Sequence, residues 1–293
     1  MIVLGLPREW QFGVDLTIWG VSERFTGITD IPPGVHYVYH SPPNEIWRIG
    51  ELLQLENNIC IYKYDSGEEK LIRRKKMESE QSVIASLIDD MRIGSGLVSF
   101  SRVVDRTEKW KKLSNLISAA DMQLVQIPQL VIPSGTIGSD LTRLATDKTE
   151  YLKQIISSRG YDGDEKLVGE IQLGYIEFLL GQNYDGMIHW RNLLEIFLNC
   201  SSTGIDANEH LFGQLIETLI VQLEEIPSDI LADVGEDGKI FLVPLIARFL
   251  EECSVLEGNM KKLCDELSAV MTKKLGGDNE WEIDNDLDDP VVV

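Results

Sequence analysis

The first quarter of the chain alternates apolar and polar residues in short runs, which is typical of half-buried β-strands. The run GVHYVYH, residues 34–40, places three side chains on each face of such a strand: Val35, Tyr37 and Tyr39 against His36, Val38 and His40. Glycine and proline interrupt the runs between Ile2 and about Lys76, as expected where the chain turns. We therefore predict a small antiparallel β-sandwich in this region.

Polar residues mark where the predicted strands turn. ELLQLE, residues 51–56, and ICIYKY, residues 59–64, flank an Asn-Asn dipeptide at residues 57–58. Asparagine tolerates the positive φ of a tight turn, so these two strands are predicted to form a hairpin. The sequence Asp-Ser-Gly at residues 65–67 is the next turn signal.

Two helices are expected next, at about residues 78–92 and 108–120. Their apolar residues recur at intervals of three and four, which is the spacing of one helix face. These residues are Val83, Ile84, Leu87, Ile88 and Met91 in the first helix and Trp110, Leu113, Leu116 and Ile117 in the second. Each helix should bury one face and complete a β-rich domain over residues 1–121.

Residues 122–138 have the composition of a linker, because two prolines and two glycines fall within them. From residue 139 to residue 275 the apolar period becomes 3.6, which predicts an all-helical domain of about five or six helices packed as antiparallel pairs. Two stripes are clearest: Leu211, Leu215, Leu219 and Leu223, and Met260, Leu263, Leu267, Val270 and Met271. We expect Trp190 to anchor this core together with four other residues: Ile171, Phe178, Leu193 and Phe197.

The last segment, residues 276–293, reads GGDNEWEIDNDLDDPVVV and has no helical period. Its acidic composition predicts a tail that is disordered on its own. The expected fold class is therefore α+β with two domains. An antiparallel β-sandwich-like domain with flanking helices precedes an all-α helical domain and an extended acidic tail.

The chain has 48 acidic and 27 basic residues, which gives a formal net charge of −21. This charge repels phosphate backbones and anionic lipid headgroups, so we expect no direct binding to nucleic acid or to a membrane. Residues 70–76, KLIRRKK, are a local exception with five cations in seven positions. This run is either the solvated edge of a hairpin or a patch for an acidic partner or for localisation.

Cysteine spacing and apolar runs indicate the compartment. The cysteines are Cys60, Cys200, Cys253 and Cys264. They lack the spacing of a disulfide framework or a zinc site, so they are expected to be reduced and packed. The few apolar residues before Pro7 do not make a signal peptide. The best apolar run, residues 240–250, is far shorter than the roughly 20 residues of a membrane span. We therefore expect a protein of the cytosol or the nucleus.

No group of residues has the spacing of a catalytic or cofactor site. His36 and His40 lie about 13 Å apart along a strand, too far to share a metal ion. Residues 94–99 begin like a dinucleotide loop but lack its third glycine, and residues 233–244 lack two ligands of a calcium loop. We therefore expect no catalytic residue, no metal and no cofactor, and we do not expect an enzyme.

Two long segments carry a family resemblance: FGVDLTIWGVSERFTGITDIPPGVHYVYH at residues 12–40 and GEIQLGYIEFLLGQNYDGMIHWRNLLEIF at residues 169–197. WKKLSNLIS at residues 110–118, EIPSDIL at residues 225–231 and the closing PVVV support it in the same order. With these motifs the chain resembles the A-one-cistron splicing factor family (Aar-two-like), whose members are assembly factors of the U-five small nuclear ribonucleoprotein.

The resemblance implies a β-rich first domain and an all-helical second domain. It further implies a pre-mRNA splicing chaperone that binds the very large central protein of the U-five particle, through the RNase-H-like and Jab/MPN-like domains of that partner. In the family, such a factor holds its partner in a cytoplasmic precursor, keeps the spliceosomal RNA helicase off it, and leaves in the nucleus. The protein should be a monomer on its own.

The acidic tail is the candidate partner-binding site, because strand-forming residues stand among its acids. These residues are Trp281, Ile283, Leu287, Val291, Val292 and Val293. We predict that the tail adds a strand to a sheet edge of the partner; the alternative is a tail that only keeps the protein soluble.

A helical-repeat adaptor is the alternative for the whole protein. LGYIEFLLGQNYDGMIHW, residues 173–190, resembles one tetratricopeptide-like hairpin. Arrays of this kind need about three or more repeats to bury a continuous core, and the sequence shows one.

Overall fold

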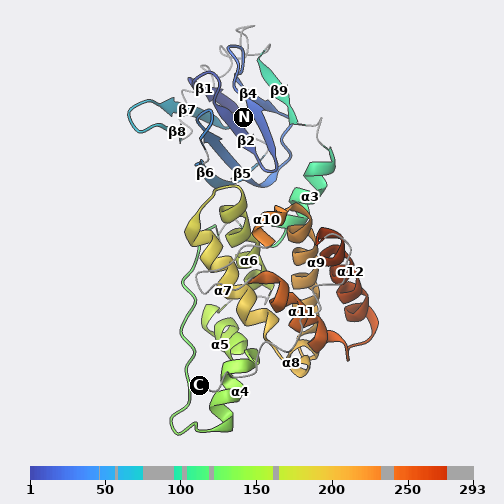
Figure 1. Cartoon of the computed structure of the whole chain (residues 1–293). Helices are drawn as coiled ribbons and strands as arrows, with labels where there is room; N and C mark the ends of the chain where they lie inside the picture. Colours follow the sequence, from blue (N-terminus) through green and yellow to red (C-terminus); the bar gives the residue numbers. More distant parts are fainter. Residues whose placement is uncertain are drawn as a thin grey trace, which may run out of the picture. The chain divides into compact units, whose positions relative to one another are not determined.

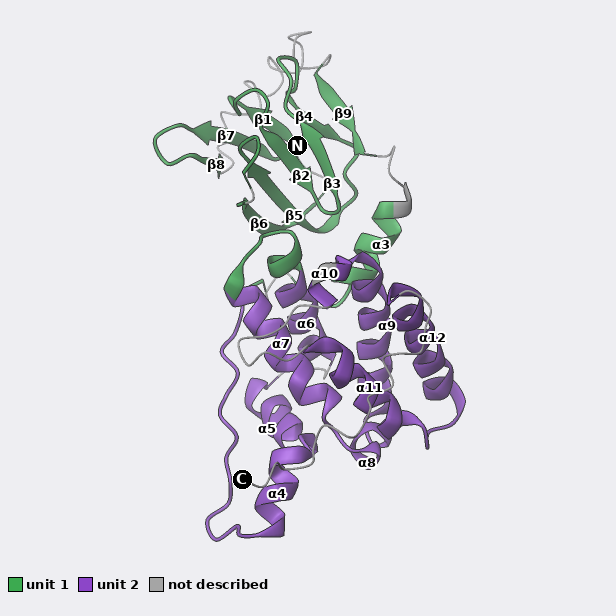
Figure 2. Cartoon of the chain, viewed as in Figure 1, with its two compact units in different colours: residues 1–122, 176–184 green, residues 123–175, 185–293 purple. Residues whose placement is uncertain are grey.

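A computed structural model gives the fold (Figure 1) and describes residues 1–45, 47–56, 59–74, 96–100, 104–118, 122–160, 165–231 and 241–275. The chain divides into two units, coloured in Figure 2. Unit 1 is residues 1–122 with residues 176–184, and unit 2 is residues 123–175 with residues 185–293. Unit 1 holds two β-sheets and unit 2 is helical, which confirms the predicted α+β fold class. Within the described part of the chain, no helix has the length and apolar character needed to cross a membrane.

The nine strands of the described part of unit 1 form two sheets. They are β1 (Ile2–Leu4), β2 (Gln11–Val14), β3 (Thr17–Gly20), β4 (Gly27–Thr29), β5 (Gly34–Ser41), β6 (Ile49–Leu55), β7 (Ile61–Asp65), β8 (Lys70–Arg73) and β9 (Leu97–Ser99). One sheet has the order β8-β7-β1-β4-β9 and the other the order β3-β2-β5-β6. The first sheet is mixed rather than antiparallel, since β1 pairs with β7 and β4 with β9 in parallel.

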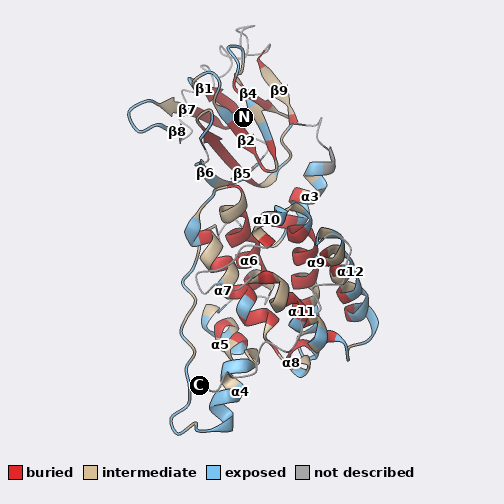
Figure 3. Cartoon of the chain, in the orientation of Figure 1, coloured by how far each residue is buried: buried red, intermediate tan, exposed pale blue. Residues whose placement is uncertain are grey.

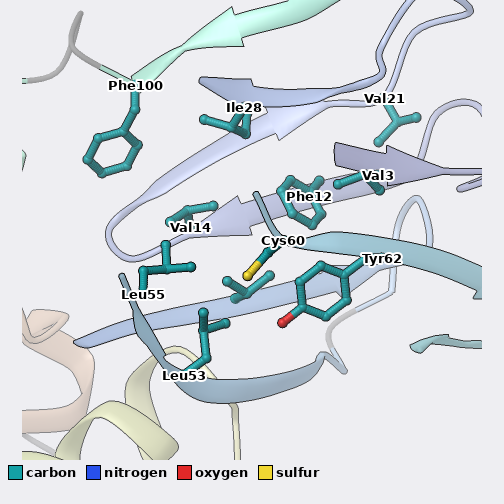
Figure 4. Close-up of a cluster of buried hydrophobic side chains, with 11 residues drawn as sticks. Val3, Phe12, Val14, Val21, Ile28, Leu53, Leu55, Cys60, Tyr62 and Phe100 are labelled. Atoms are coloured by element: carbon teal, nitrogen blue, oxygen red, sulfur yellow. The ribbon is translucent and has the colours of Figure 1, made fainter. Parts of the chain in front are cut away.

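The predicted hairpin around residues 57–58 is wrong. β6 pairs with β5, whereas β7 pairs with β1 and β8 in the other sheet. Apolar residues of β6 and of the β7 region therefore meet in the core from opposite sheets instead of lying side by side (Figure 4). Residues 57–58 themselves lie outside the described part. The turn predicted at residues 65–67 is confirmed, because the Asp65 carboxylate accepts hydrogen bonds from the backbone N–H groups of Gly67 (2.8 Å) and Glu68 (3.2 Å).

The core of unit 1 lies between its two sheets (Figure 4). It contains Val3, Phe12, Val14, Val21, Ile28, Val38, Leu53, Leu55, Cys60, Tyr62 and Phe100. Burying one large apolar side chain of this kind contributes roughly 1.5–3 kcal/mol to folding. The alternation seen in the sequence therefore positions one face of every long strand in this core.

The predicted strand at residues 34–40 is confirmed as β5, but both of its faces are buried. Residues 176–184, which belong to unit 1, lie against Tyr37 at Gly181. A Cβ on Gly181 would lie 2.3 Å from the Tyr37 hydroxyl, so only glycine fits there. Arg48 lies over the Tyr39 ring and donates a 3.2 Å hydrogen bond to a backbone carbonyl in the same segment. The strand is therefore central rather than half-exposed.

The second helix predicted for the β-rich domain is α3 (Val104–Ser114). It begins before residue 108 and ends before residue 120. Its predicted apolar face is confirmed, since Trp110 and Leu113 are buried and the Trp110 indole N–H donates a 2.7 Å hydrogen bond to the Val35 carbonyl. The first predicted helix, residues 78–92, lies outside the described part.

The remaining helices begin after the predicted linker. They are α4 (Ser139–Thr146), α5 (Thr149–Arg159), α6 (Glu165–Leu179), α7 (Tyr184–Leu198), α8 (Ser202–Asp206), α9 (Glu209–Glu225), α10 (Ser228–Leu231), α11 (Leu242–Cys253) and α12 (Gly258–Lys274). Six of these nine described helices have 11 or more residues, which agrees with the five or six expected. Buried residues recur along each of the six longer helices (Figure 3).

The predicted Trp190 core is confirmed with one correction. Trp190 is 3% exposed, and Ile171, Leu193 and Phe197 are fully buried. Phe178 is only half-buried, because the last residues of α6 belong to unit 1 and not to the helical core. The Leu211 stripe of α9 is buried over its whole length.

Candidate interaction surfaces

The predicted tail site lies outside the described residues. This holds for Trp281, Ile283, Leu287, Val291, Val292 and Val293. Docking of the tail on a partner therefore stays a prediction, and the described residues supply other candidate surfaces.

β7, β8 and the turn between them form a hairpin that we call the basic hairpin, residues 61–74; the turn is exposed, and β8 is exposed apart from Leu71, whereas β7 begins in the core (Figure 3). It carries the described part of the predicted cationic run. Glu68 pairs with Lys70, and Arg73 donates to the sulfur of Cys60 at 3.5 Å. Lys63 and Arg74 make no ion pair with any described residue. The basic hairpin thus has two cations available to a ligand, Lys63 on β7 and Arg74 after β8.

Two hollows lie beside β8, and Ile72 lines both of them. The inner hollow, about 310 Å³, is lined among others by Val38, Ile49, Glu51 and Leu71. The outer hollow, about 380 Å³, is lined among others by Lys63, Ile72 and Arg74. The lining of the inner hollow also includes the cations Lys70 and Arg73, and the Glu51 carboxylate there accepts a 2.7 Å hydrogen bond from the hydroxyl of Tyr62. The lining of the outer hollow also includes the carboxylate of Asp65.

A second exposed surface runs along the linker into α4. We call it the linker stripe, and it consists of Val131, Ile132, Ile137 and Leu141, which are 70%, 48%, 76% and 41% exposed. α4 buries none of its residues, although its apolar residues share one face. These side chains remain in water in the free protein and are available to a partner.

The linker is extended and is held by side chains of α5. The Gln154 amide pairs with both backbone groups of Val131, accepting from its N–H (2.9 Å) and donating to its carbonyl (3.0 Å). The Tyr151 hydroxyl donates a 2.7 Å hydrogen bond to the Pro128 carbonyl. The linker stripe is therefore presented by a fixed backbone.

A buried ion pair holds the start of the linker. Two nitrogen atoms of Arg159 donate to the two carboxylate oxygens of Glu170 at 2.9 and 3.0 Å. The same guanidinium donates to the carbonyls of Gln126 (3.0 Å) and Val125 (3.1 Å). The Arg159 and Glu170 side chains are 9% and 3% exposed, so the cluster, which we call the Arg159 clamp, is a desolvated centre.

His189 lies beside the Arg159 clamp. Its Nε2 atom is 3.3 Å from Glu170 but makes no hydrogen bond of good geometry. Sequence reasoning missed the clamp. A signal was present, because Glu170 interrupts an otherwise apolar face of α6.

A second buried polar pair lies in unit 1. His36 Nδ1 is 2.7 Å from the carboxylate of Asp15, and His36 Nε2 is 2.8 Å from the Pro32 carbonyl. Asp15 also accepts a 3.0 Å hydrogen bond from the Tyr37 N–H. Both ring nitrogens of His36 face acceptors, and both side chains are almost completely buried. The site therefore holds a proton between the two groups.

The pH dependence of this pair follows from two shifts. Burial alone would lower the pKa of His36, but the hydrogen bond and charge of Asp15 outweigh it, and the pKa is raised above 6.5. Burial raises the pKa of Asp15. Because both pKa values are raised, the folded pair binds a proton more tightly than the same two groups do in the unfolded chain. The bound proton therefore stabilises the folded state. This contribution is fully present below the ordinary pKa of histidine and is lost as pH rises through the pKa of His36 in the folded protein.

We expect urea denaturation between about pH 6 and pH 9 to show a falling free energy of unfolding, by at most about 1.4 kcal/mol per pH unit from this pair. His36→Gln should remove that slope. His210→Gln, at an exposed histidine, is the matched control and should keep it. A slope that is the same in both variants contradicts the assignment.

The other histidine and cysteine side chains discussed in the sequence analysis pack within the described part of the fold. No group of three metal-ligating side chains occurs among the described residues. His40 stacks on Trp10, with ring centroids 5.9 Å apart, and burial lowers its pKa. All four cysteines are free and buried, which confirms the predicted packed thiols. Burial raises the pKa of Cys200 to about 12, so that thiol stays protonated at neutral pH.

Two family models match the chain. The first, AAR2 N-terminal domain, covers residues 1–127, and the second, AAR2 C-terminal repeat region, covers residues 124–283. The chain is also similar to curated proteins named Protein AAR2 homolog. The Mus musculus protein is 24% identical, with 100% of this chain and 92% of that protein covered. The Oryctolagus cuniculus protein is 25% identical (100% and 91%), and the Caenorhabditis elegans protein is 22% identical (98% and 95%).

Proposed function

The chain belongs to the AAR2 family of splicing-related proteins, and from this premise we propose that it is an assembly factor of the U-five small nuclear ribonucleoprotein. It binds the large central protein of that particle through the RNase-H-like and Jab/MPN-like domains of that partner. The observation that carries the proposal is the match of both family domains, in order, over residues 1–283.

The protein acts by occupying surfaces and not by catalysis. While bound, it keeps the spliceosomal RNA helicase off the partner, and it is released on maturation in the nucleus after assembly in the cytoplasm. The linker stripe supports a binding role, because it presents four exposed apolar side chains on a backbone fixed by Gln154 and Tyr151. The net charge of −21 favours a protein partner over a direct contact with RNA.

The test is a binding experiment with purified full-length protein and the two named domains of the partner. Co-elution as a stoichiometric complex is expected, and a pull-down from lysate should return one very large protein. A helical-repeat adaptor would instead capture many short carboxy-terminal peptides. Failure to bind either purified domain contradicts the proposed function.

The tail makes a separate, measurable contribution to this complex. Ordering six to eight residues opposes binding by on the order of 10 kcal/mol, so the tail alone should bind weakly. Tethered to a body that already holds the partner, it acts at an effective concentration near millimolar. A protein ending at Gly277 should therefore keep its thermal stability but bind the partner about 10²-fold more weakly, measured by titration calorimetry.

Replacing only the tail acids with their amides is the matched control for this truncation. It should mainly slow association, because charge steers encounter more than it sets residence time. A protein ending at Gly277 that binds as tightly as the full chain would show that the folded units alone carry the interface.

A further inference from the structure

The linker backbone has one occupied side and one free side at Val131. Gln154 of α5 pairs with both the N–H (2.9 Å) and the carbonyl (3.0 Å) of Val131, as a neighbouring strand would. In an extended chain, successive residues direct these groups to opposite sides. The N–H and carbonyl groups of Leu130 and Ile132 therefore point away from α5, and they make no hydrogen bond with any described residue. We call these groups the linker edge, and such an edge is a template for one more strand.

Prolines bound the linker edge on both sides. The carbonyl of Pro128, two residues before Leu130, accepts the hydrogen bond of the Tyr151 hydroxyl (2.7 Å). Pro133 follows Ile132 directly and has no N–H group to donate. The linker edge is therefore short. It lies entirely within unit 2, as does α5, which holds its other side.

The side chains around the linker edge are apolar and uncharged. None of residues 122–139 carries a charge, although the chain as a whole has a net charge of −21. The linker stripe exposes its apolar side chains here and continues onto α4, which has eight residues and buries none of them. An isolated helix of this length is marginal in water. Contact with a partner would therefore stabilise α4 as well as cover the stripe.

Charge and entropy decide between the possible occupants. A second copy of the chain carries the same net charge of −21, and charge of one sign keeps copies apart. A strongly acidic or basic segment finds no counter-charge among residues 122–139 and loses its hydration there. A flexible neutral peptide must be ordered residue by residue, and so short an edge returns few hydrogen bonds for that entropy. The occupant that fits is an apolar strand already held at the edge of a folded sheet.

We propose that Leu130 and Ile132 pair, as a strand, with an exposed sheet edge of the protein partner, and that the linker stripe packs against the apolar side chains beside that edge. The inference rests on the proposed function, which supplies a folded protein partner, and it names the surface of this chain that meets it. The backbone groups fix the register of the contact, and the stripe selects an uncharged, apolar edge.

The test is hydrogen exchange at single amides of the full chain, free and in complex with the two partner domains named above. Exchange at Leu130 and Ile132 should be slower in the complex by about tenfold, as for an edge that is paired roughly nine-tenths of the time. Exchange at Val131 should change less, because its N–H is already bonded to Gln154. A complex that forms without this alternation overturns the inference and leaves the proposed function standing. Absence of a complex with either domain contradicts both.

Added charges test the linker stripe. The double variant Ile132→Asp and Ile137→Asp places two carboxylates in the apolar contact, so binding should weaken by about 10²-fold. The matched control, Ser134→Asp with Thr142→Asp, adds the same charge at two exposed positions outside the stripe and should weaken binding by less than about threefold. All four positions are exposed, so both variants should keep the circular dichroism of the folded protein. Equal binding by the two variants overturns the inference.

Sedimentation of the free protein tests the second copy as the occupant. We expect a monomer in which the amides of Leu130 and Ile132 exchange at the same rate at every protein concentration. Slower exchange at these amides as the concentration rises, together with dimers in sedimentation, would show that a second copy takes the linker edge and would overturn the inference.

Discussion

Replacing Trp190 with alanine should lower the free energy of unfolding of the helical unit by about 3–5 kcal/mol. The indole is 3% exposed, and its ring centroid lies 5.5 Å from that of Tyr175. Its N–H donates a 3.0 Å hydrogen bond to the side-chain Oε1 of Gln222, and the backbone carbonyl of Gln222 accepts a 2.7 Å hydrogen bond from the Tyr175 hydroxyl. The substitution leaves a cavity and an unpaired acceptor where α6, α7 and α9 meet.

Urea denaturation followed by circular dichroism at 222 nm measures this loss. Trp190→Phe keeps an aromatic ring but removes the indole N–H and part of the ring volume, so it should cost about 1–3 kcal/mol, less than Trp190→Ala. Tyr184→Ala, on an exposed aromatic residue of the same helix, is the control and should change stability by less than about 0.5 kcal/mol. Equal effects of Trp190→Ala and Tyr184→Ala would place the indole outside the core.

The helical half of the fold follows from its sequence because helical periodicity is local. Leu211 and Leu215 are one turn apart, so their shared face is visible without knowledge of the partner helix. What periodicity does not show is how closely two helices approach. A Cβ on Gly174 would lie 3.1 Å from the backbone of α7 at Gly186 and Trp190. Glycine here permits a close crossing of α6 and α7, and a pattern of apolar residues does not reveal it.

The β-sandwich was less predictable, since strand pairing is not local. Alternation correctly predicts β5, β6 and β7 as strands. It does not say that β6 and β7 belong to different sheets, because a hairpin and a crossover between sheets both bury one face of each strand. The parallel pair of β1 with β7 joins residues that are 59 positions apart, such as Ile2 and Ile61. No short-range signal specifies such a contact.

Among the candidate surfaces, too, local features could be predicted from the sequence and contacts between distant residues could not. The basic hairpin was visible as a run of cations, because charge is a property of composition. The Asp15–His36 pair and the Arg159 clamp were not, because each joins residues of different elements. Asp15 has a positive φ of 55°, which places its carboxylate at a turn, and this conformation is visible only in the structure. The tail was identified by sequence alone, and its function depends on the experiments above.

Breaking the Arg159 clamp should have an effect as large as that of losing Trp190. Glu170→Ala removes the carboxylate and leaves the guanidinium, 9% exposed, without its counter-charge. Removing one member of a buried ion pair typically lowers stability by about 3–5 kcal/mol, because the remaining charge stays desolvated. The matched control is Asp140→Ala, which removes a carboxylate 4.0 Å from Arg143 on the surface of α4 and should change stability by less than about 1 kcal/mol.

Glu170→Ala should also loosen the start of the linker. This second effect distinguishes a clamp from an ion pair that is only buried. Arg159 donates to the Gln126 and Val125 carbonyls in the geometry that Glu170 fixes. Once Glu170 is absent, those two bonds lose their orienting partner, and the start of the linker should become more accessible to protease and to hydrogen exchange than in the Asp140→Ala protein. The Gln154 contact with Val131 is independent of the clamp, so protection there should persist. Loss of stability with an unchanged linker would mean that Arg159 holds α5 to α6 and contributes nothing to presenting the linker stripe.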